Sequence, residues 1–175
     1  MQTFILSIII IISLIVGITT AVAAKSFAPW LPCRNKDLER IFKIADLKNN
    51  EIFYDLGCGD GKTIIYANKH YKAKAIGLEL SLPLFLICKI RQFFNNDMNI
   101  IFKWKNFFNE NISKADVIYF FGVPSTIKTK LKTKIEKEAK TGARVISYVF
   151  KVEGWKPIIA DKPTDKDLAI YMYKR

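Results

Sequence analysis

The feature that most limits how this chain can fold is an uncharged run from Phe4 to Ala24. As an α-helix rising about 1.5 Å per residue, the run would cover roughly 30 Å, the thickness of the hydrocarbon core of a bilayer. The rest of the chain, roughly 140 residues, is enough for a single domain with one hydrophobic core. We therefore expect a transmembrane anchor at 4–24, an interfacial elbow and lead-in helix at 25–48, and one domain at 49–175.

A cleaved signal peptide is the alternative for this segment, because Ala21-Val22-Ala23 has the small-x-small form of a cleavage site. A signal peptide normally begins with positive residues, however, and no Lys or Arg precedes Phe4. The basic residues follow the run instead, and a positive flank normally stays in the cytoplasm; they are Lys25, Arg34, Lys36, Arg40 and Lys43. We therefore favour an uncleaved helix with the folded domain on the cytoplasmic side.

The chain is strongly basic, with 28 Lys and Arg against 16 Asp and Glu and a net charge of +12. Anionic lipid headgroups attract basic residues near a membrane helix, which gives this charge a natural partner. Nucleic acid is the competing partner, but the sequence has no helix-turn-helix, zinc-finger or RNP pattern, so we expect no nucleic acid. The three cysteines lack C-x-x-C spacing and predict neither a disulfide framework nor a metal site.

Apolar strand-like runs alternate with helical stretches along the rest of the chain. The expected strands are 52–56, 73–80, 99–104, 116–121 and 143–150, and the expected helices are 37–47, 62–70, 84–94 and 125–140, the last with its lysines on a solvated face. Two closing runs, 155–160 and 168–173, flank a polar turn typical of an antiparallel hairpin. The predicted fold is α/β, a doubly wound, mostly parallel seven-stranded sheet that ends in this hairpin.

The most informative stretch is Tyr54-Asp55-Leu56-Gly57-Cys58-Gly59-Asp60-Gly61, where a strand ends in three alternating glycines and a helix begins. Glycine at such a corner permits a positive φ and lets a ligand lie against bare backbone. The spacing differs from the G-x-G-x-x-G of dinucleotide folds, and Gly61-Lys62-Thr63 lacks the earlier glycine of a P-loop. The Asp55 carboxylate would repel a pyrophosphate, but it could meet the cationic amino group of a methionine moiety.

A second carboxylate, Glu79, ends the next predicted strand, where an acid can accept both ribose hydroxyls of an adenosine. The simpler explanation is that the glycines only make a turn and that both acids lie on the surface. Asp55, the glycines and Glu79 in one strand-helix-strand context favour a nucleotide-type site instead.

With these residues, the sequence resembles the class I methyltransferases that use S-adenosylmethionine. Three further segments narrow the resemblance to the small membrane-anchored protein lysine methyltransferases, which include the mitochondrial enzymes for the ATP synthase c-subunit and the adenine nucleotide translocase. These segments are Phe121-Gly122-Val123-Pro124, Gly142-Ala143-Arg144-Val145 and Gly154-Trp155-Lys156-Pro157. The resemblance covers about residues 27–173 and implies a Rossmann-like fold with S-adenosylmethionine as the cofactor.

The resemblance also implies roles for individual positions. The cofactor-binding set would be Asp55, Leu56, Gly57, Cys58, Gly59, Asp60, Gly61, Glu79 and Asn106. In that set, Asp55 and the glycines would hold the methionine end and Glu79 the ribose. Asn106 matches a position where the family usually has Asp, and its amide oxygen can still accept from the adenine amino group, without charge assistance. Backbone carbonyls near Phe121, Gly122, Val123 and Pro124 would orient the substrate amine.

Methyl transfer to lysine needs a neutral amine aligned with the methyl donor, and desolvation lowers an amine pKa in that direction. Aromatic rings could face the sulfonium cation of the cofactor, although packing in the hydrophobic core also explains each of them. The candidates are Trp104, Phe107, Phe120 and Phe121.

We therefore expect a single-pass membrane methyltransferase that modifies lysine side chains of membrane or membrane-associated proteins. A methyltransferase for a membrane-soluble small molecule, such as a quinone or lipid, is one alternative, and a deep apolar pocket would favour it. A non-catalytic S-adenosylmethionine-binding module is another. The acceptor and the oligomeric state stay open at this stage.

Overall fold

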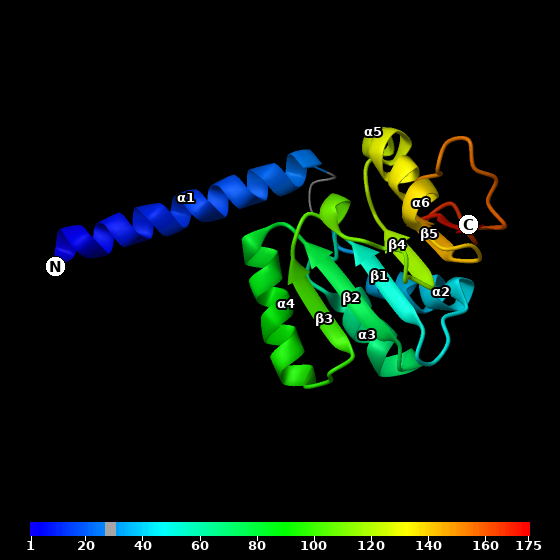
Figure 1. Ribbon diagram of the computed structural model, residues 1–175, viewed down its shortest axis with the longest axis horizontal. Helices are drawn as coiled ribbons and strands as arrows, with labels where there is room; N and C mark the ends of the chain where they lie inside the picture. Colours follow the sequence, from blue (N-terminus) through cyan, green and yellow to red (C-terminus); the bar gives the residue numbers. More distant parts are fainter. Residues whose placement is uncertain (27–30) are drawn as a thin grey trace.

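The computed structural model describes residues 1–26 and 31–175 and shows an N-terminal helix that projects from an α/β domain (Figure 1). Helix α1 (Gln2–Ser26) covers the predicted anchor. Its segment Gln2–Val22 has a mean hydropathy of 2.8, is not buried in the protein, and is the one helix in the described part of the chain long and apolar enough to cross a membrane. Residues 27–30 of the predicted elbow lie outside the described residues.

The domain is built on a seven-stranded sheet with the strand order β3-β2-β1-β4-β5-β7-β6. Five strands are parallel, β1 (Ile52–Leu56), β2 (Lys74–Glu79), β3 (Ile100–Trp104), β4 (Val117–Phe120) and β5 (Arg144–Tyr148), whereas β7 (Ile170–Lys174) runs antiparallel to β5 and to β6 (Ile159–Asp161). The predicted fold class is confirmed. Because the chain winds from β1 toward β3 and then returns to β4, the direction of winding changes between β1 and β4, where ligands bind in such sheets.

Helices cover both faces of the sheet, which explains why its strands are almost continuously apolar. One face is packed by α2 (Asn35–Ala45), α3 (Lys62–Tyr71) and α4 (Leu82–Asn95). The other is packed by a helical stretch made of α5 (Pro124–Thr126), the π-helical turn η2 (Ile127–Leu131) and α6 (Lys132–Glu138), with the 3₁₀ turn η1 (Phe107–Asn109) nearby.

One lysine of this stretch departs from the predicted solvated face. Lys134 is buried, and its ammonium group donates to the backbone carbonyl of Glu110 at 2.6 Å and to the carboxylate of Glu138 at 2.7 Å. The Glu110 carbonyl and the Glu138 carboxylate replace the water that a buried ammonium group loses. Lys134 therefore joins α6 to the end of η1.

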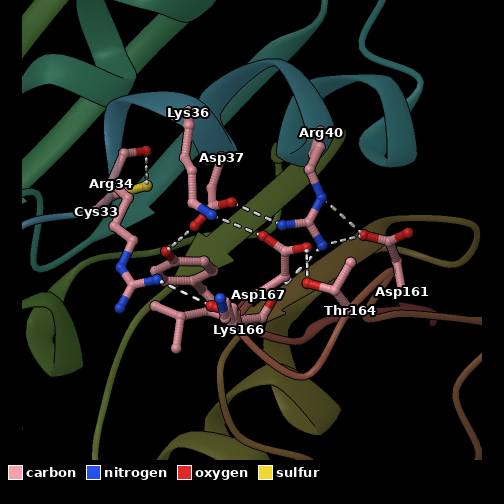
Figure 2. Close-up of polar contacts among 11 residues, drawn as sticks. Cys33, Arg34, Lys36, Asp37, Arg40, Asp161, Thr164, Lys166 and Asp167 are labelled. Carbon is pink, nitrogen blue, oxygen red and sulfur yellow. Dashed lines mark hydrogen bonds and ion pairs between the residues drawn. The ribbon is translucent and has the colours of Figure 1, made fainter.

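A network of charged groups joins α2 to the closing hairpin (Figure 2). The fully buried Asp37 carboxylate accepts hydrogen bonds of 2.6 Å from both Arg40 and the hydroxyl of Tyr148. Arg40 also pairs with Asp161, which ends β6, and Lys36 pairs with Asp167 at 2.7 Å. These contacts fix the first turns of α2 against β5 and the closing hairpin.

Candidate active site

The glycine-rich loop joins β1 to α3 at the carboxyl end of the sheet. Its backbone is tied to the neighbouring strand, because the N–H groups of Gly57 and Cys58 both donate to the carbonyl of Leu78 at 3.0 Å. Gly61 has a φ of 76°, and a Cβ there would lie 2.7 Å from the ring of Phe102. Both the left-handed conformation and the close contact exclude a larger residue, so glycine is required at this corner.

Glu79 fastens this loop to the end of β2. Its carboxylate is buried and accepts three backbone hydrogen bonds, from Gly59 at 2.9 Å, from Leu80 at 2.9 Å and from Ser81 at 2.7 Å. Burial raises the pKa of Glu79, and the backbone donors act against that rise. A carboxylate has about four acceptor positions, so a position for one further donor is left.

Asp55 lies at the centre of the candidate site with only 2% of its surface exposed. One carboxylate oxygen accepts from the hydroxyl of Thr63, and the other, Oδ1, is buried with no hydrogen-bond partner among the described residues. Burial raises the pKa of Asp55 to about 7, although the Thr63 hydroxyl acts in the opposite direction. A buried acceptor without a donor is unfavourable, so this oxygen is prepared to receive a ligand's donor.

Tyr119 stands directly opposite Asp55 in the register of β1 and β4. Its hydroxyl is the other buried side-chain atom without a hydrogen-bond partner in the described part of the chain, and it lies near the thiol of Cys33. Burial raises the pKa of Cys33 to about 11, so this thiol is neutral at physiological pH.

Asp55 and Tyr119, which carry these unpartnered atoms, both line one cavity of about 30 Å³, which has room for about one water molecule. The cavity wall comes from the glycine loop, from the end of β4 and from the segment ahead of α2; it consists of Leu31, Pro32, Cys33, Asp55, Gly57, Cys58, Gly59, Asp60, Lys62, Thr63, Tyr119 and Phe121. The structure thus brings most of the predicted glycine-loop residues together with three residues ahead of α2, which are Leu31, Pro32 and Cys33.

Two residues of the loop have structural partners. The ammonium group of Lys62 donates to the carbonyl of Cys33 at 2.7 Å and to the side chain of Asn35 at 3.2 Å. Asp60 forms an ion pair with Arg91 of α4 at 2.9 Å. Lys62 therefore holds the residues around the start of α2, Cys33 and Asn35, against the loop. This role differs from that of a P-loop lysine, which binds phosphate.

The predicted aromatic candidates do not all reach this cavity. Phe121, directly after β4, lines it and packs edge to face on Tyr148 with ring centroids 5.0 Å apart. Phe120 and Phe107 are buried in the core on the opposite face of the sheet. Trp104 is half exposed at the end of β3, where its indole N–H donates to the carbonyl of Leu80.

Asn106 lies apart from the Asp55 cavity, after β3. Its side-chain oxygen accepts from the N–H of Phe108 at 3.0 Å and caps the 3₁₀ turn η1. Of the predicted substrate-positioning residues, Val123 precedes α5 and Pro124 begins it, directly after Phe121 and Gly122. The predicted residues thus frame the carboxyl ends of β1, β2, β3 and β4 rather than one closed pocket.

Sequence reasoning missed Tyr119 and Cys33. Tyr119 could have been found, because parallel pairing of two predicted strands places it on the same face as Asp55. Cys33 could not, since nothing in the local sequence shows that the segment before α2 returns to the glycine loop.

Comparisons with known proteins agree with this geometry. The family described as the ANTKMT methyltransferase domain matches residues 55–159. A protein-lysine N-methyltransferase from Saccharolobus islandicus (strain REY15A) is 35% identical over 154 residues, which cover 83% of this chain and 92% of the relative. A human lysine N-methyltransferase named for the c-subunit of ATP synthase is 28% identical over 148 residues, covering 79% of this chain and 58% of the relative.

Solved structures show the same fold. An RNA methyltransferase from Salinibacter ruber, in complex with S-adenosyl-L-homocysteine, superposes with a TM-score of 0.77 at 24% identity. The alignment covers 82% of this chain and 93% of that chain.

Proposed function

Because the chain belongs to the ANTKMT methyltransferase domain family and is an S-adenosylmethionine-dependent methyltransferase, we propose that it methylates lysine side chains of membrane or membrane-associated proteins. The observation that supports cofactor binding at this site is the unpartnered Asp55 oxygen at the β1–β4 switch point. The name of the Saccharolobus relative supports lysine as the acceptor, and helix α1 supports a membrane location.

The residues present fit the methionine end of the cofactor. A ligand ammonium group would satisfy Oδ1 of Asp55 and favour the ionised carboxylate, since opposite charges at close range lower a carboxyl pKa. The remaining acceptor position of Glu79 would take one ribose hydroxyl, and Asn106, whose side-chain oxygen caps η1, would flank the adenine. Bound S-adenosylmethionine supplies an electrophilic methyl group.

The cavity beside Asp55 is lined on one side by Leu31 and Pro32. The glycine loop and the strand ends are fixed by the hydrogen bonds described above. Leu31, by contrast, is 59% exposed and precedes the first helix of the domain. We propose that Leu31 and Pro32 move outward to admit the cofactor.

The acceptor lysine would approach from the end of β4. Backbone carbonyls near Gly122 would orient the amine, and Phe121 would exclude water beside it. A desolvated amine loses its proton more easily, because burial disfavours the charged form, so no dedicated base is required. If α1 is in the same membrane as the substrate, confinement to one surface raises the effective concentration of the acceptor without new contacts.

The test is transfer of labelled methyl from S-adenosylmethionine into detergent-solubilised membranes of the source cell, followed by acid hydrolysis of the products. Wild type is compared with Asp55→Asn and with the control Asp46→Asn, which changes an exposed carboxylate that does not line the cavity. We expect labelled methyl-lysine with wild type and the control, and none with Asp55→Asn.

Two results would contradict the proposal. Label in the lipid extract alone would indicate a methyltransferase for a membrane-soluble small molecule. Cofactor binding without label in any fraction would indicate a binding module.

A further inference from the structure

Helix α4 turns an apolar face outward. Its inward side is formed by Cys88, which is fully buried, and by Gln92, which donates to the carbonyl of Ile100. The large apolar side chains on the outward side are 40–79% exposed: Leu86, Ile87, Ile90, Phe93 and Phe94. Met98, in the loop after the helix, is 95% exposed.

These exposed residues form one continuous surface. Leu86, Ile90 and Phe93 follow at spacings of four and three, which places them on one side of an α-helix. The whole segment from Leu82 to Asn96 contains no acidic residue. Its two basic residues are Lys89, at the edge of the face, and Arg91, which turns to Asp60. A helix that faces water normally carries charged side chains of both signs there, so this face is unusual in a protein with 28 Lys and Arg.

The position of the face relative to α1 indicates what covers it. Helix α1 contacts α4, and Figure 1 shows that α1 projects past the side of the domain that α4 forms. Other exposed large apolar side chains of the described chain are mostly in α1 itself. The apolar surface of the domain and the apolar helix are therefore continuous, and a bilayer is the partner that would cover both.

We propose that the outward face of α4, formed by Leu86, Ile90, Phe93 and Phe94, lies in the interfacial layer of the bilayer that α1 spans. Apolar side chains enter the boundary between headgroups and acyl chains, while Lys89 meets anionic headgroups. The inference rests on the membrane location in the proposed function, but it concerns a separate surface of the domain.

This second attachment has a consequence for the active site. A single helix followed by a connecting segment fixes the distance of a domain from the membrane but not its rotation. Contact through α4 fixes the rotation as well. The ion pair between Arg91 of α4 and Asp60, which lines the Asp55 cavity, then gives the site a defined orientation to the membrane surface.

The test uses the full chain reconstituted into vesicles of phosphatidylcholine and phosphatidylglycerol. Since the native cysteines are buried, a nitroxide spin label can be attached to Phe93→Cys, and to the control Lys137→Cys on the exposed side of α6. Phe93 is 79% exposed, so the substitution leaves the core intact. Collision rates with oxygen, which concentrates in lipid, and with a water-soluble nickel chelate then report the surroundings of each label.

We expect the label at 93 to favour oxygen and the label at 137 to favour the chelate. If the vesicles float with the protein but the label at 93 meets the chelate as freely as the label at 137, the α4 inference alone is wrong. Poor access of both reagents to position 93 would show that protein, such as a second copy of the chain, covers the face, and it would also overturn the inference. A chain that does not float with the vesicles would overturn the membrane location in the proposed function and the α4 contact together.

Discussion

Two clusters of buried polar groups lie close together in this domain and differ in one respect. The Asp37 carboxylate, between α2 and β5, has a donor for each oxygen, from Arg40 and from Tyr148. The Asp55 carboxylate, on β1, has a donor for one oxygen only. A buried acid with all its partners within the protein supports the fold, whereas one with a free oxygen beside a second unpartnered group is prepared for a ligand.

The largest expected effect is at the incomplete cluster. Asp55→Asn keeps the shape but removes the charge that would meet the cofactor's ammonium group. We expect cofactor affinity to fall by about 2–4 kcal/mol, roughly 30-fold to 1000-fold in Kd. Calorimetric titration of the detergent-solubilised full chain with S-adenosylhomocysteine measures this. The unfolding free energy at pH 8 should not decrease, because the substitution removes a buried charge that has one donor, Thr63, and one oxygen without a partner. An unchanged Kd would contradict the role given to Asp55.

Asp37→Asn should give the opposite pattern. It removes a charge that both Arg40 and Tyr148 use, so the free energy of unfolding should fall by about 1–3 kcal/mol. Denaturant unfolding followed by circular dichroism measures the loss. Cofactor affinity, measured well below the unfolding transition, should change far less than in Asp55→Asn. A larger effect on affinity than on stability would show that the two clusters act as one.

Cofactor binding should also depend on pH through Asp55. Burial raises the pKa of Asp55 to about 7, so at lower pH a proton must leave before the carboxylate can meet a cation. The Kd for the cofactor should therefore rise by about tenfold per pH unit below 7. Titrations from pH 5.5 to about 8 check this, and Asp55→Asn should lack the dependence.

The same pKa has a consequence for the ligand-free protein. Between the unfolded pKa of 3.8 and the folded pKa of about 7, the folded state binds more protons than the unfolded state. The contribution of Asp55 to stability is therefore present at low pH and is lost as the pH rises through that window, by up to about 1.4 kcal/mol per unit. Unfolding of wild type and Asp55→Asn across this range should differ in slope; parallel curves would count against the buried, protonated acid.

The smallest effect concerns Tyr119. Tyr119→Phe removes a hydroxyl that has no partner within the described protein, so the unfolding free energy should change by less than about 1 kcal/mol. If the hydroxyl bonds the cofactor, affinity falls by about 0.5–1.5 kcal/mol. Calorimetry on the same preparation decides between a ligand contact and a core tyrosine with no role in binding.

The sequence was sufficient for the parts of the molecule that depend on local periodicity. The alternation of strands and helices predicted the sheet and its closing hairpin, and the glycine loop predicted the corner after β1. Glu79 was expected at the end of β2 and lies there, but its three backbone hydrogen bonds were not foreseen, because they depend on how the loop folds back.

Other features depend on contacts between distant parts of the chain. Lys134 can be buried because carbonyl groups after β3, those of Phe108 and Glu110, accept from its ammonium group. The outward face of α4 could not be recognised either. That helix is apolar on nearly all sides, so its pattern does not show which side packs on the sheet.

The hydrogen bond from Lys62 to the carbonyl of Cys33 limits where the chain can be truncated and which part of its N-terminal region can be exchanged. This bond fixes the cavity wall that Leu31, Pro32 and Cys33 form ahead of α2. A variant trimmed to remove α1 would thus keep its sheet and lose part of the cavity wall if the cut fell after residue 33. Helix α1 could be exchanged for another, but residues 31–33, which line the cavity, belong to the enzyme.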